Sequence, residues 1–286
     1  MKKSLKKILG VKVNIGMTRS EFMHTFNHFM SLNTSTIIAT VNPEFVLSSI
    51  KDTEFREILN KDCFCIPDGV GILLASIYIE NMKKTRSKFL SFVQTMKSIF
   101  CGNLSEYRIT GADLIYDICQ YAEKHDKSVY LLGGMLVGPF GNPIKDRDLA
   151  LEASEVLKKK FPKLNIVGAT SAFTRGPADD EDTINYIQKN MKDKNINSID
   201  ILFVSYGGGF QEKWLKRNQK CLNYKVGIGV GGTFSFVVNN YLRAPLFIQK
   251  LNLEWVYRLL TQPFRIKRIV NAFLVFPYKV FKFHSR

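Results

Sequence analysis

The sequence predicts an α/β fold, with a mostly parallel sheet flanked by helices and a basic, aromatic helical appendage at the C-terminus. Two observations carry this prediction. Short apolar segments of strand character alternate with longer segments of helical periodicity, and the composition shifts near residue 240 toward basic and aromatic residues. With 286 residues, of which 45% are hydrophobic, the chain can build one large α/β domain or one domain with an appendage.

The predicted strands and helices alternate along the chain. The strand candidates are Ile37–Val41, Cys63–Ile66, Val129–Leu132, Asn165–Ala169, Ile201–Ser205 and Val226–Val230. The helical candidates between them include Glu44–Leu59, Ala112–His125, Asp146–Lys160 and Asp179–Lys192. This order indicates βα units with right-handed crossovers, and therefore a Rossmann-like sheet. We expect this domain to occupy residues 1–240 and the appendage to occupy 241–286.

The net charge of +16 calls for an anionic partner: nucleic acid, a membrane surface or a phosphate-bearing substrate. From Trp255 to the C-terminus there are seven Lys or Arg residues, no acidic residue and many aromatic residues. This composition favours a helical element at a membrane surface. The alternative is that the aromatic side chains pack onto the domain and leave the bases outside. No run of about 20 apolar residues predicts a membrane span.

The five cysteines form no CxxC pair, and their odd number without a signal-peptide pattern indicates reduced thiols in a cytoplasmic protein. The four histidines form no cluster with metal-ligand spacing.

Glycine-rich or polar loops follow five of the predicted strands. In such sheets ligands bind outside the carboxyl ends of the strands, and glycines there let backbone N–H groups approach a phosphate. We therefore expect a nucleotide or sugar-nucleotide pocket at this edge, with Gly133, Gly134, Gly231 and Gly232 among its residues. The loop sequences are TVNPEF, PDGVG, GGMLVG, YGGGFQEKW and GVGGTF.

These motifs resemble a known family in their order. The continuous run from TVNPEF to PDGVGI (40–72) is followed by RITGADL, LLGG, QEKW, GVGGTF and RAPLFIQKLNLEWVYRLLTQPFR. Together they are similar to the WecG/TagA/CpsF family of bacterial glycosyltransferases from about Thr34 to Arg268. The resemblance implies transfer of an N-acetylmannosamine-type sugar from a UDP donor to a polyprenyl-diphosphate-linked sugar, with inversion. The products would be teichoic acid, common antigen or capsule.

Asp68, in the PDG motif, is the expected general base. An inverting transfer needs a base within hydrogen-bond reach of the acceptor hydroxyl, and the resemblance implies the same residue. Taken alone, the residues favour an aspartate that caps the helix starting near Val70. With the resemblance we favour the base. Thr40 and Asn42 are then expected to contact the donor sugar, and an N-cap role before Pro43 is compatible with this.

The leaving diphosphate needs positive charge. The resemblance implies arginines at Arg108, Arg258, Arg265 and Arg268, with a solvated basic face as the alternative, and Gln211 as a uridine or diphosphate contact. The sequence Asp146-Arg147-Asp148 has the pattern of a metal-binding Asp-x-Asp motif, but it follows Lys145 and not an apolar strand, and its position at a helix start explains it adequately. The resemblance also implies transfer without a metal. We therefore expect no metal and no cofactor.

Three departures from the family pattern concern binding. Gly208-Gly209-Phe210 stands where Ala-Pro-Lys is usual, and Ser235 stands where Asp is usual. Residues 80–107 form an insertion whose apolar stripe fits core packing, an oligomer interface or a second membrane contact.

Two other functions would explain single features of the sequence. A nicotinamide-dependent oxidoreductase explains the sheet and its glycines, but the GIGVGG turn follows the sixth predicted strand, whereas the dinucleotide-binding fingerprint follows the first. A nucleic-acid-binding protein explains the charge, but the aromatic residues cluster in the tail. We expect instead a UDP-sugar donor, a polyprenyl-linked acceptor and an anionic membrane, with the protein peripheral on the inner face of the cell membrane.

Overall fold

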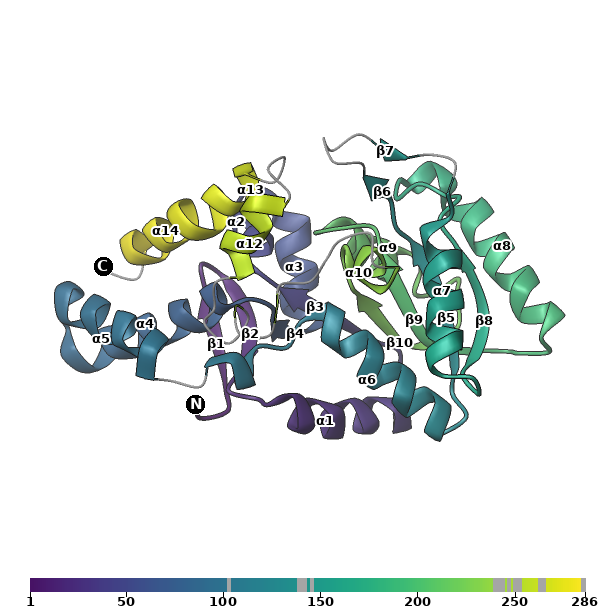
Figure 1. Ribbon diagram of the computed structural model, residues 1–286, viewed down its shortest axis with the longest axis horizontal. Helices are drawn as coiled ribbons and strands as arrows, with labels where there is room; N and C mark the ends of the chain where they lie inside the picture. The colour runs from purple at the N-terminus through teal and green to yellow at the C-terminus, as the bar shows by residue number, and fades with distance from the viewer. Residues whose placement is uncertain are drawn as a thin grey trace.

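In the computed structural model, all six predicted strands join one parallel sheet in the order β4-β3-β10-β9-β5-β8 (Figure 1). The Rossmann-like α/β architecture is therefore confirmed. The strands are β3 (Thr36–Val41), β4 (Cys63–Pro67), β5 (Ser128–Gly133), β8 (Asn165–Thr170), β9 (Ile199–Ser205) and β10 (Tyr224–Gly229). The structure describes residues 1–101, 104–137, 143–144, 147–238, 245, 248, 254–261 and 266–283.

Helices cover both faces of the sheet because alternate strand residues point to opposite sides. Leu131 packs in a core cluster with α1 (Arg19–Ser31), α6 (Gly111–Lys124) and α7 (Leu149–Lys160). Its neighbour Leu132 packs in a different cluster, with α8 (Asp180–Asp193) and α9 (Phe210–Asn218). The continuous apolar character of the strands thus reflects burial on both faces.

The predicted helix over Glu44–Leu59 is instead two helices, α2 (Pro43–Lys51) and α3 (Thr53–Lys61). Asp52 separates them, serving as the C-cap of the first and the N-cap of the second. Its side chain accepts a hydrogen bond from Phe55 N–H at 3.0 Å. The apolar periodicity continues across this break, which is why one helix was expected; the prediction was wrong at Asp52.

Several elements were not predicted. A hairpin of β1 (Ser4–Ile8) and β2 (Val11–Ile15) contributes to a third core cluster beside β4. After β4, by contrast, the helix expected to start near Val70 is α4 (Val70–Thr85), and α5 (Lys88–Cys101) lies in the expected insertion. The short elements are η1 (Leu104–Tyr107), β6 (Leu136–Val137), β7 (Pro143–Ile144), η2 (Pro177–Asp179) and α10 (Thr233–Val237).

The described part of the C-terminal segment is helical, as expected. It comprises α12 (Glu254–Thr261), α13 (Ile266–Val270), a π-helical turn (Asn271–Val275) and α14 (Phe276–Phe283). Phe276 and Val280 are buried in the core cluster that contains residues of α2 and α4. Other aromatic residues of the segment stay exposed, so packing onto the domain, one of the two alternatives for the tail, accounts for only part of its aromatic residues. The expected domain boundary near residue 240 lies outside the described residues.

No helix in the described ranges combines the length and the apolar character needed to cross a bilayer.

One carboxyl group is buried inside the fold. Glu212, near the start of α9, has no exposed surface, and burial raises its pKa from the ordinary 4.5 to about 7. Its two oxygens accept hydrogen bonds from Gly209 N–H and from the Gln211 side chain. Between pH 4.5 and 7 the folded chain therefore holds a proton that the unfolded chain has lost, so stability falls as pH rises through this window.

We expect the free energy of unfolding to fall on the order of 2 kcal/mol more between pH 5 and pH 8 in the wild-type protein than in Glu212→Gln. The amide cannot titrate, so the variant should lack this slope even if it is less stable throughout. Denaturant unfolding at both pH values measures it. Parallel pH dependences in the two proteins would show that Glu212 is ionised in the folded state over the whole range.

Candidate functional site

A pocket lies at the carboxyl edge of the sheet, where four neighbouring strands end. Residues after β3, β4, β9 and β10 meet there with the N-terminus of α6 and one residue of the C-terminal segment. The lining residues are Thr40, Asn42, Phe45, Asp68, Thr110, Gly111, Ala112, Gly207, Gly208, Gln211, Val230, Gly231, Gly232, Thr233, Phe236 and Arg268. The predicted strand-end pocket is therefore present as a single cavity.

The pocket brings together seven residues that the sequence singled out. These are Thr40, Asn42, Asp68, Gln211, Gly231, Gly232 and Arg268. Arg108 is half-buried two residues before Thr110, and the intervening Ile109 N–H donates to Pro67 O at 3.0 Å. This bond holds the Arg108 segment beside the strand end that carries Asp68.

The remaining predicted residues are placed differently. Gly133 ends β5 and Gly134 follows it. Strand β9 separates β5 from β10, and both glycines are absent from the pocket lining. A Cβ atom at Gly133 would lie 2.6 Å from the Tyr206 ring, so this glycine is required by close packing. Arg258 lies in α12 but its side chain, like all of Arg265, is outside the described residues.

Asp68 is held by its backbone at the end of β4. Its N–H donates to Val41 O at 2.8 Å, which continues the pairing of β4 with β3 by one residue. Helix α4 begins at Val70, and its N-cap position belongs to Gly69, which has a φ of 99°. The residue before Val70 is thus a glycine in the left-handed region, and Asp68 is not the helix cap that the residues alone favoured.

Asn42 caps α2 and lines the pocket at once. Its Oδ1 accepts hydrogen bonds from Glu44 N–H at 3.0 Å and from Phe45 N–H at 3.1 Å. The group that Asn42 can offer a ligand is therefore its Nδ2 amide, which is a donor. Thr40, buried two residues earlier, donates its hydroxyl to Gly229 O at 3.1 Å and so ties β3 to β10 at the pocket floor.

Gln211 shapes the loop after β10. It is fully buried; its Oε1 accepts from Gly231 N–H at 2.9 Å and its Nε2 donates to Glu212 at 2.8 Å. Gly231, with a φ of +55°, and Gly232 face open space where a Cβ would stand. The loop thus leaves room for a ligand close to its backbone, and the buried amide holds it in that shape.

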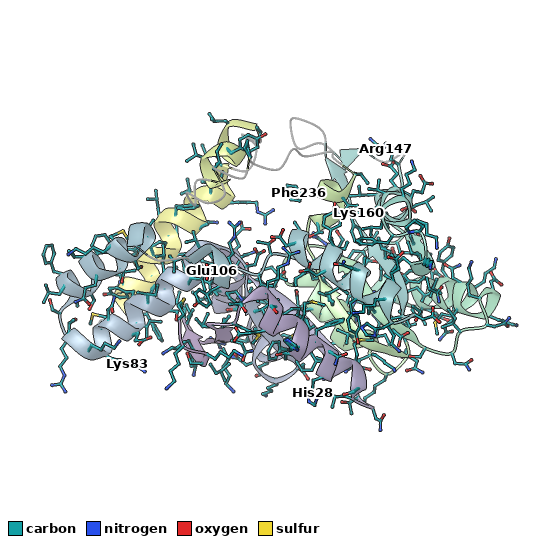
Figure 2. The ribbon with its side chains drawn as sticks, turned by 60° about the horizontal axis from the view of Figure 1, so that its bottom comes forward. His28, Lys83, Glu106, Arg147, Lys160 and Phe236 are labelled. Atoms are coloured by element: carbon teal, nitrogen blue, oxygen red, sulfur yellow. The ribbon has the colours of Figure 1, made fainter. Side chains whose placement is uncertain are left out.

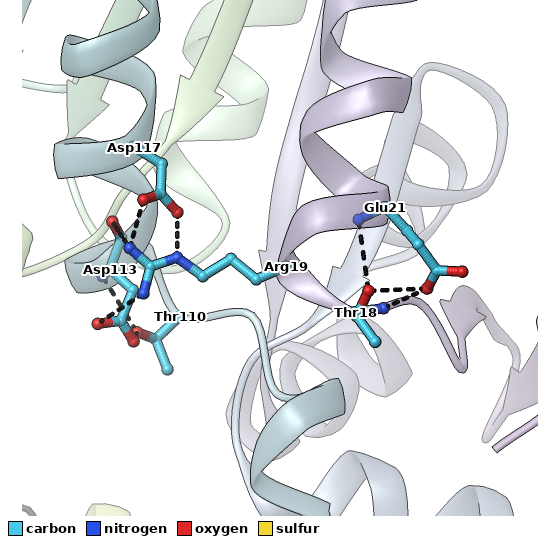
Figure 3. Close-up of polar contacts among 6 residues, drawn as sticks. All are labelled: Thr18, Arg19, Glu21, Thr110, Asp113 and Asp117. Carbon is cyan, nitrogen blue, oxygen red and sulfur yellow. Dashed lines mark hydrogen bonds and ion pairs between the residues drawn. The ribbon is translucent and has the colours of Figure 1, made fainter.

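The N-terminus of α6 is fixed at the pocket by polar contacts from another helix. The Thr110 hydroxyl accepts from Asp113 N–H and donates to the Asp113 carboxylate at 2.7 Å. Arg19, at the start of α1, pairs with both Asp113 and Asp117 of α6 (Figure 3). The helices α2 and α6 therefore both begin at the pocket, and their N-termini favour an anion there.

Arg268 reaches the pocket from the C-terminal segment. Its guanidinium forms a two-nitrogen contact with one Glu44 oxygen, with the Nε contact at 2.7 Å. Glu44 lies in the first turn of α2, two residues after Asn42. Phe236, in α10, lines the same pocket, and Figure 2 shows it between the C-terminal helices and the rest of the domain.

Of the two aspartates in the Asp-x-Asp sequence, the structure describes Asp148, which has a structural role. Asp148 caps α7, accepting from Leu151 N–H at 2.9 Å, and its other oxygen accepts from Ser171 N–H at 3.0 Å. Asp146 lies outside the described residues. Within the described ranges, no group of three His, Cys, Asp or Glu residues is placed to hold a metal ion.

Some pocket residues were not predicted. Thr110 and Gly111 belong to the RITGAD motif, from which only Arg108 was chosen, and Gly207 belongs to the YGGGF loop, of which only Gly208-Gly209-Phe210 was named. These three could have been found by treating each motif as a whole. Phe236 had no signal, since it is an apolar residue in an apolar stretch.

The double role of Asn42 gives a sharp expectation. Asn42→Asp keeps a good N-cap but replaces the amide donor with a negative charge beside the pocket. We expect the melting temperature to stay near that of the wild type and the affinity for UDP-N-acetylmannosamine, the type of donor implied by the resemblance, to fall at least about tenfold. Thermal unfolding and calorimetric titration measure the two effects. Unchanged affinity for this UDP-sugar would remove Asn42 from the ligand contacts.

Comparisons with known proteins agree with the resemblance. The model of the Glycosyl transferase WecG/TagA/CpsF family matches residues 6–286. The chain is 26% identical over 244 residues to an N-acetylglucosaminyldiphosphoundecaprenol N-acetyl-beta-D-mannosaminyltransferase of Bacillus subtilis (strain 168), covering 85% of this chain and 78% of the relative. It is 26% identical over 262 residues to the Staphylococcus aureus (strain MRSA252) protein with the same name, covering 92% and 85%. The chain belongs to the WecG/TagA/CpsF family of glycosyl transferases.

Proposed function

We propose that this protein is an inverting glycosyltransferase that moves an N-acetylmannosamine-type sugar, or a related hexose, from a UDP-sugar to a polyprenyl-diphosphate-linked acceptor in cell-surface polysaccharide synthesis. Family membership supports the glycosyltransferase class, and the relatives' names specify a mannosaminyl group and an N-acetylglucosaminyl-diphosphoundecaprenol acceptor. The observation that carries the proposal is the convergence of seven expected residues on one strand-end pocket. The oxidoreductase and nucleic-acid interpretations find no support in the family.

Asp68 acts as the general base in this proposal. Its carboxylate takes the proton from the acceptor hydroxyl as that oxygen attacks the anomeric carbon of the donor. The bond between the anomeric carbon and the UDP oxygen breaks on the opposite side, and UDP leaves with the electron pair, which inverts the configuration. The backbone bond from Asp68 to Val41 fixes the position from which the carboxylate acts.

The negative charge on the leaving diphosphate is stabilised by fixed positive groups. Arg268 and the N-termini of α2 and α6 lie at the pocket, and Arg108 lies close to the start of α6. Such pre-positioned groups stabilise charge as it develops because they need no reorganisation during the reaction. Arg258 and Arg265 are proposed to join them from the same C-terminal segment. No metal is needed in this scheme.

Substrate positioning falls to the neighbouring strand ends. Thr40 and Asn42 contact the donor sugar, with Asn42 donating from its amide. The open space above Gly231 and Gly232 admits the nucleotide diphosphate to the loop backbone, and Gln211 keeps that loop in shape. The acceptor is carried by a lipid, so the protein works at the inner face of the cell membrane, and the basic C-terminal segment, residues 241–286, binds that surface and completes the site.

The central test is Asp68→Asn. The amide keeps the shape of the side chain but cannot take a proton, so turnover with UDP-N-acetylmannosamine and a short-chain lipid-linked acceptor should be abolished while UDP affinity stays within a few-fold. The matched control is Asp193→Asn, an exposed residue of α8.

The assay measures UDP release and lipid-linked product in the presence of EDTA. Wild type and the control should turn over at equal rates there. Near-normal turnover by Asp68→Asn would remove this residue from the mechanism. Loss of wild-type turnover in EDTA, restored by Mg²⁺, would contradict the metal-free scheme.

A further inference from the structure

Helix α5 packs against α4 with its polar side inward. Ser91 and Thr95 are buried, and they hydrogen-bond to Thr85 at 2.7 Å and to Asn81 at 3.3 Å. This is the reverse of an ordinary surface helix, which buries its apolar stripe. Among its described side chains, the apolar stripe expected in this insertion is half-buried or exposed, so core packing does not account for it.

Part of the apolar side of α5 instead faces outward: Val93, Met96 and Ile99 are half-buried, but three other apolar residues are exposed. Phe89 is 74% exposed, Leu90 51% and Phe92 49%. These three residues lie within one turn of α5. Exposed apolar residues that are scattered singly over a protein surface are ordinary, but three large ones together mark an interaction surface.

This patch adjoins the C-terminal segment. The Phe281 ring of α14 lies 5.9 Å from the Tyr78 ring of α4, and Lys88 Nζ at the start of α5 lies 5.8 Å from its centroid. Leu274 and Tyr278 lie seven and three residues before Phe281 in the same segment, and they are 67% and 63% exposed. In Figure 1, α4, α5 and α14 lie together at one end of the molecule.

We call the exposed residues Phe89, Leu90, Phe92, Leu274 and Tyr278 the α5/α14 surface. The chain around it is predominantly basic, although Lys84 pairs with Glu80 at 3.0 Å. Between Glu80 and Glu106 there is no acidic residue, and the five bases are Lys83, Lys84, Arg86, Lys88 and Lys97. All five are exposed, and Figure 2 shows Lys83 at this end of the molecule.

This charge distinguishes between partners. A symmetric contact with a second copy would bring the same basic surface against itself, which is repulsive. An anionic bilayer offers both the opposite charge and an apolar layer just beneath it. At 14 residues, α5 is too short to span a bilayer but suits a helix that lies in its interface.

We propose that the α5/α14 surface inserts into the headgroup layer of an anionic lipid bilayer, so that the insertion helix and the C-terminal segment form one membrane-binding face. This inference rests on the proposed function, because the acceptor is lipid-linked. Arg268 lies only six residues before Leu274, so binding through this face holds the pocket close to the lipid on which the acceptor is carried.

The test uses Phe89→Ser/Leu90→Ser/Phe92→Ser in the full chain and flotation with vesicles of phosphatidylglycerol and phosphatidylcholine. Binding should weaken at least about tenfold because three inserting side chains are lost. The control Leu151→Ser/Tyr186→Ser changes exposed apolar residues of α7 and α8 and should bind as wild type. Wild type should bind pure phosphatidylcholine vesicles more weakly.

Turnover with the short-chain acceptor in detergent separates this inference from the proposed function. The triple variant should keep wild-type turnover there. Wild-type flotation of the triple variant would overturn the inference while leaving the proposed function intact. Light scattering measures the oligomeric state of both proteins. The inference would also fail if the wild type were a dimer, the triple variant were a monomer, and both bound vesicles equally. The α5/α14 surface would then be a self-association face.

Discussion

The docking of Phe276 and Val280 into the core beside α2 and α4 is the contact on which the completed pocket depends. It fixes α14 and the π-helical turn before it, and so brings Arg268 to Glu44. Burying a phenylalanine contributes about 1.5–3 kcal/mol, whereas an exposed ion pair contributes about 1 kcal/mol or less. The apolar contact therefore holds the segment, and the ion pair orients the arginine.

The rest of the pocket is set by hydrogen bonds between strand ends that need no ligand. Thr40 joins β3 to β10, Asp68 joins β4 to β3, and Gln211 holds the loop at Gly231. Arg19 fixes the start of α6 from outside. A site built this way loses little entropy when substrate binds, since its groups already stand in place.

The sheet could be predicted because its strands are buried on both faces and are therefore apolar runs. The order of the strands could not, since it depends on contacts far apart in sequence. This is why Gly133 was expected at the pocket although β9 separates its strand from β10. The apolar periodicity continues through Asp52, so the helix break there has no local signal in the sequence. Nothing near Arg268 in the sequence indicates its partner Glu44, which lies 224 residues away. The site residues that were identified came from motif resemblance, which carries the long-range information that local patterns lack.

The most direct measurement of this account is the single-turnover rate of Arg268→Ala at saturating donor, compared with Lys267→Ala, its exposed neighbour on α13. If the C-terminal segment supplies charge to the transition state, the rate of Arg268→Ala should fall about 10²-fold, while Lys267→Ala keeps the wild-type rate. Equal rates in the two variants would contradict the account, because the segment would then be an attachment to the enzyme and no part of its active site.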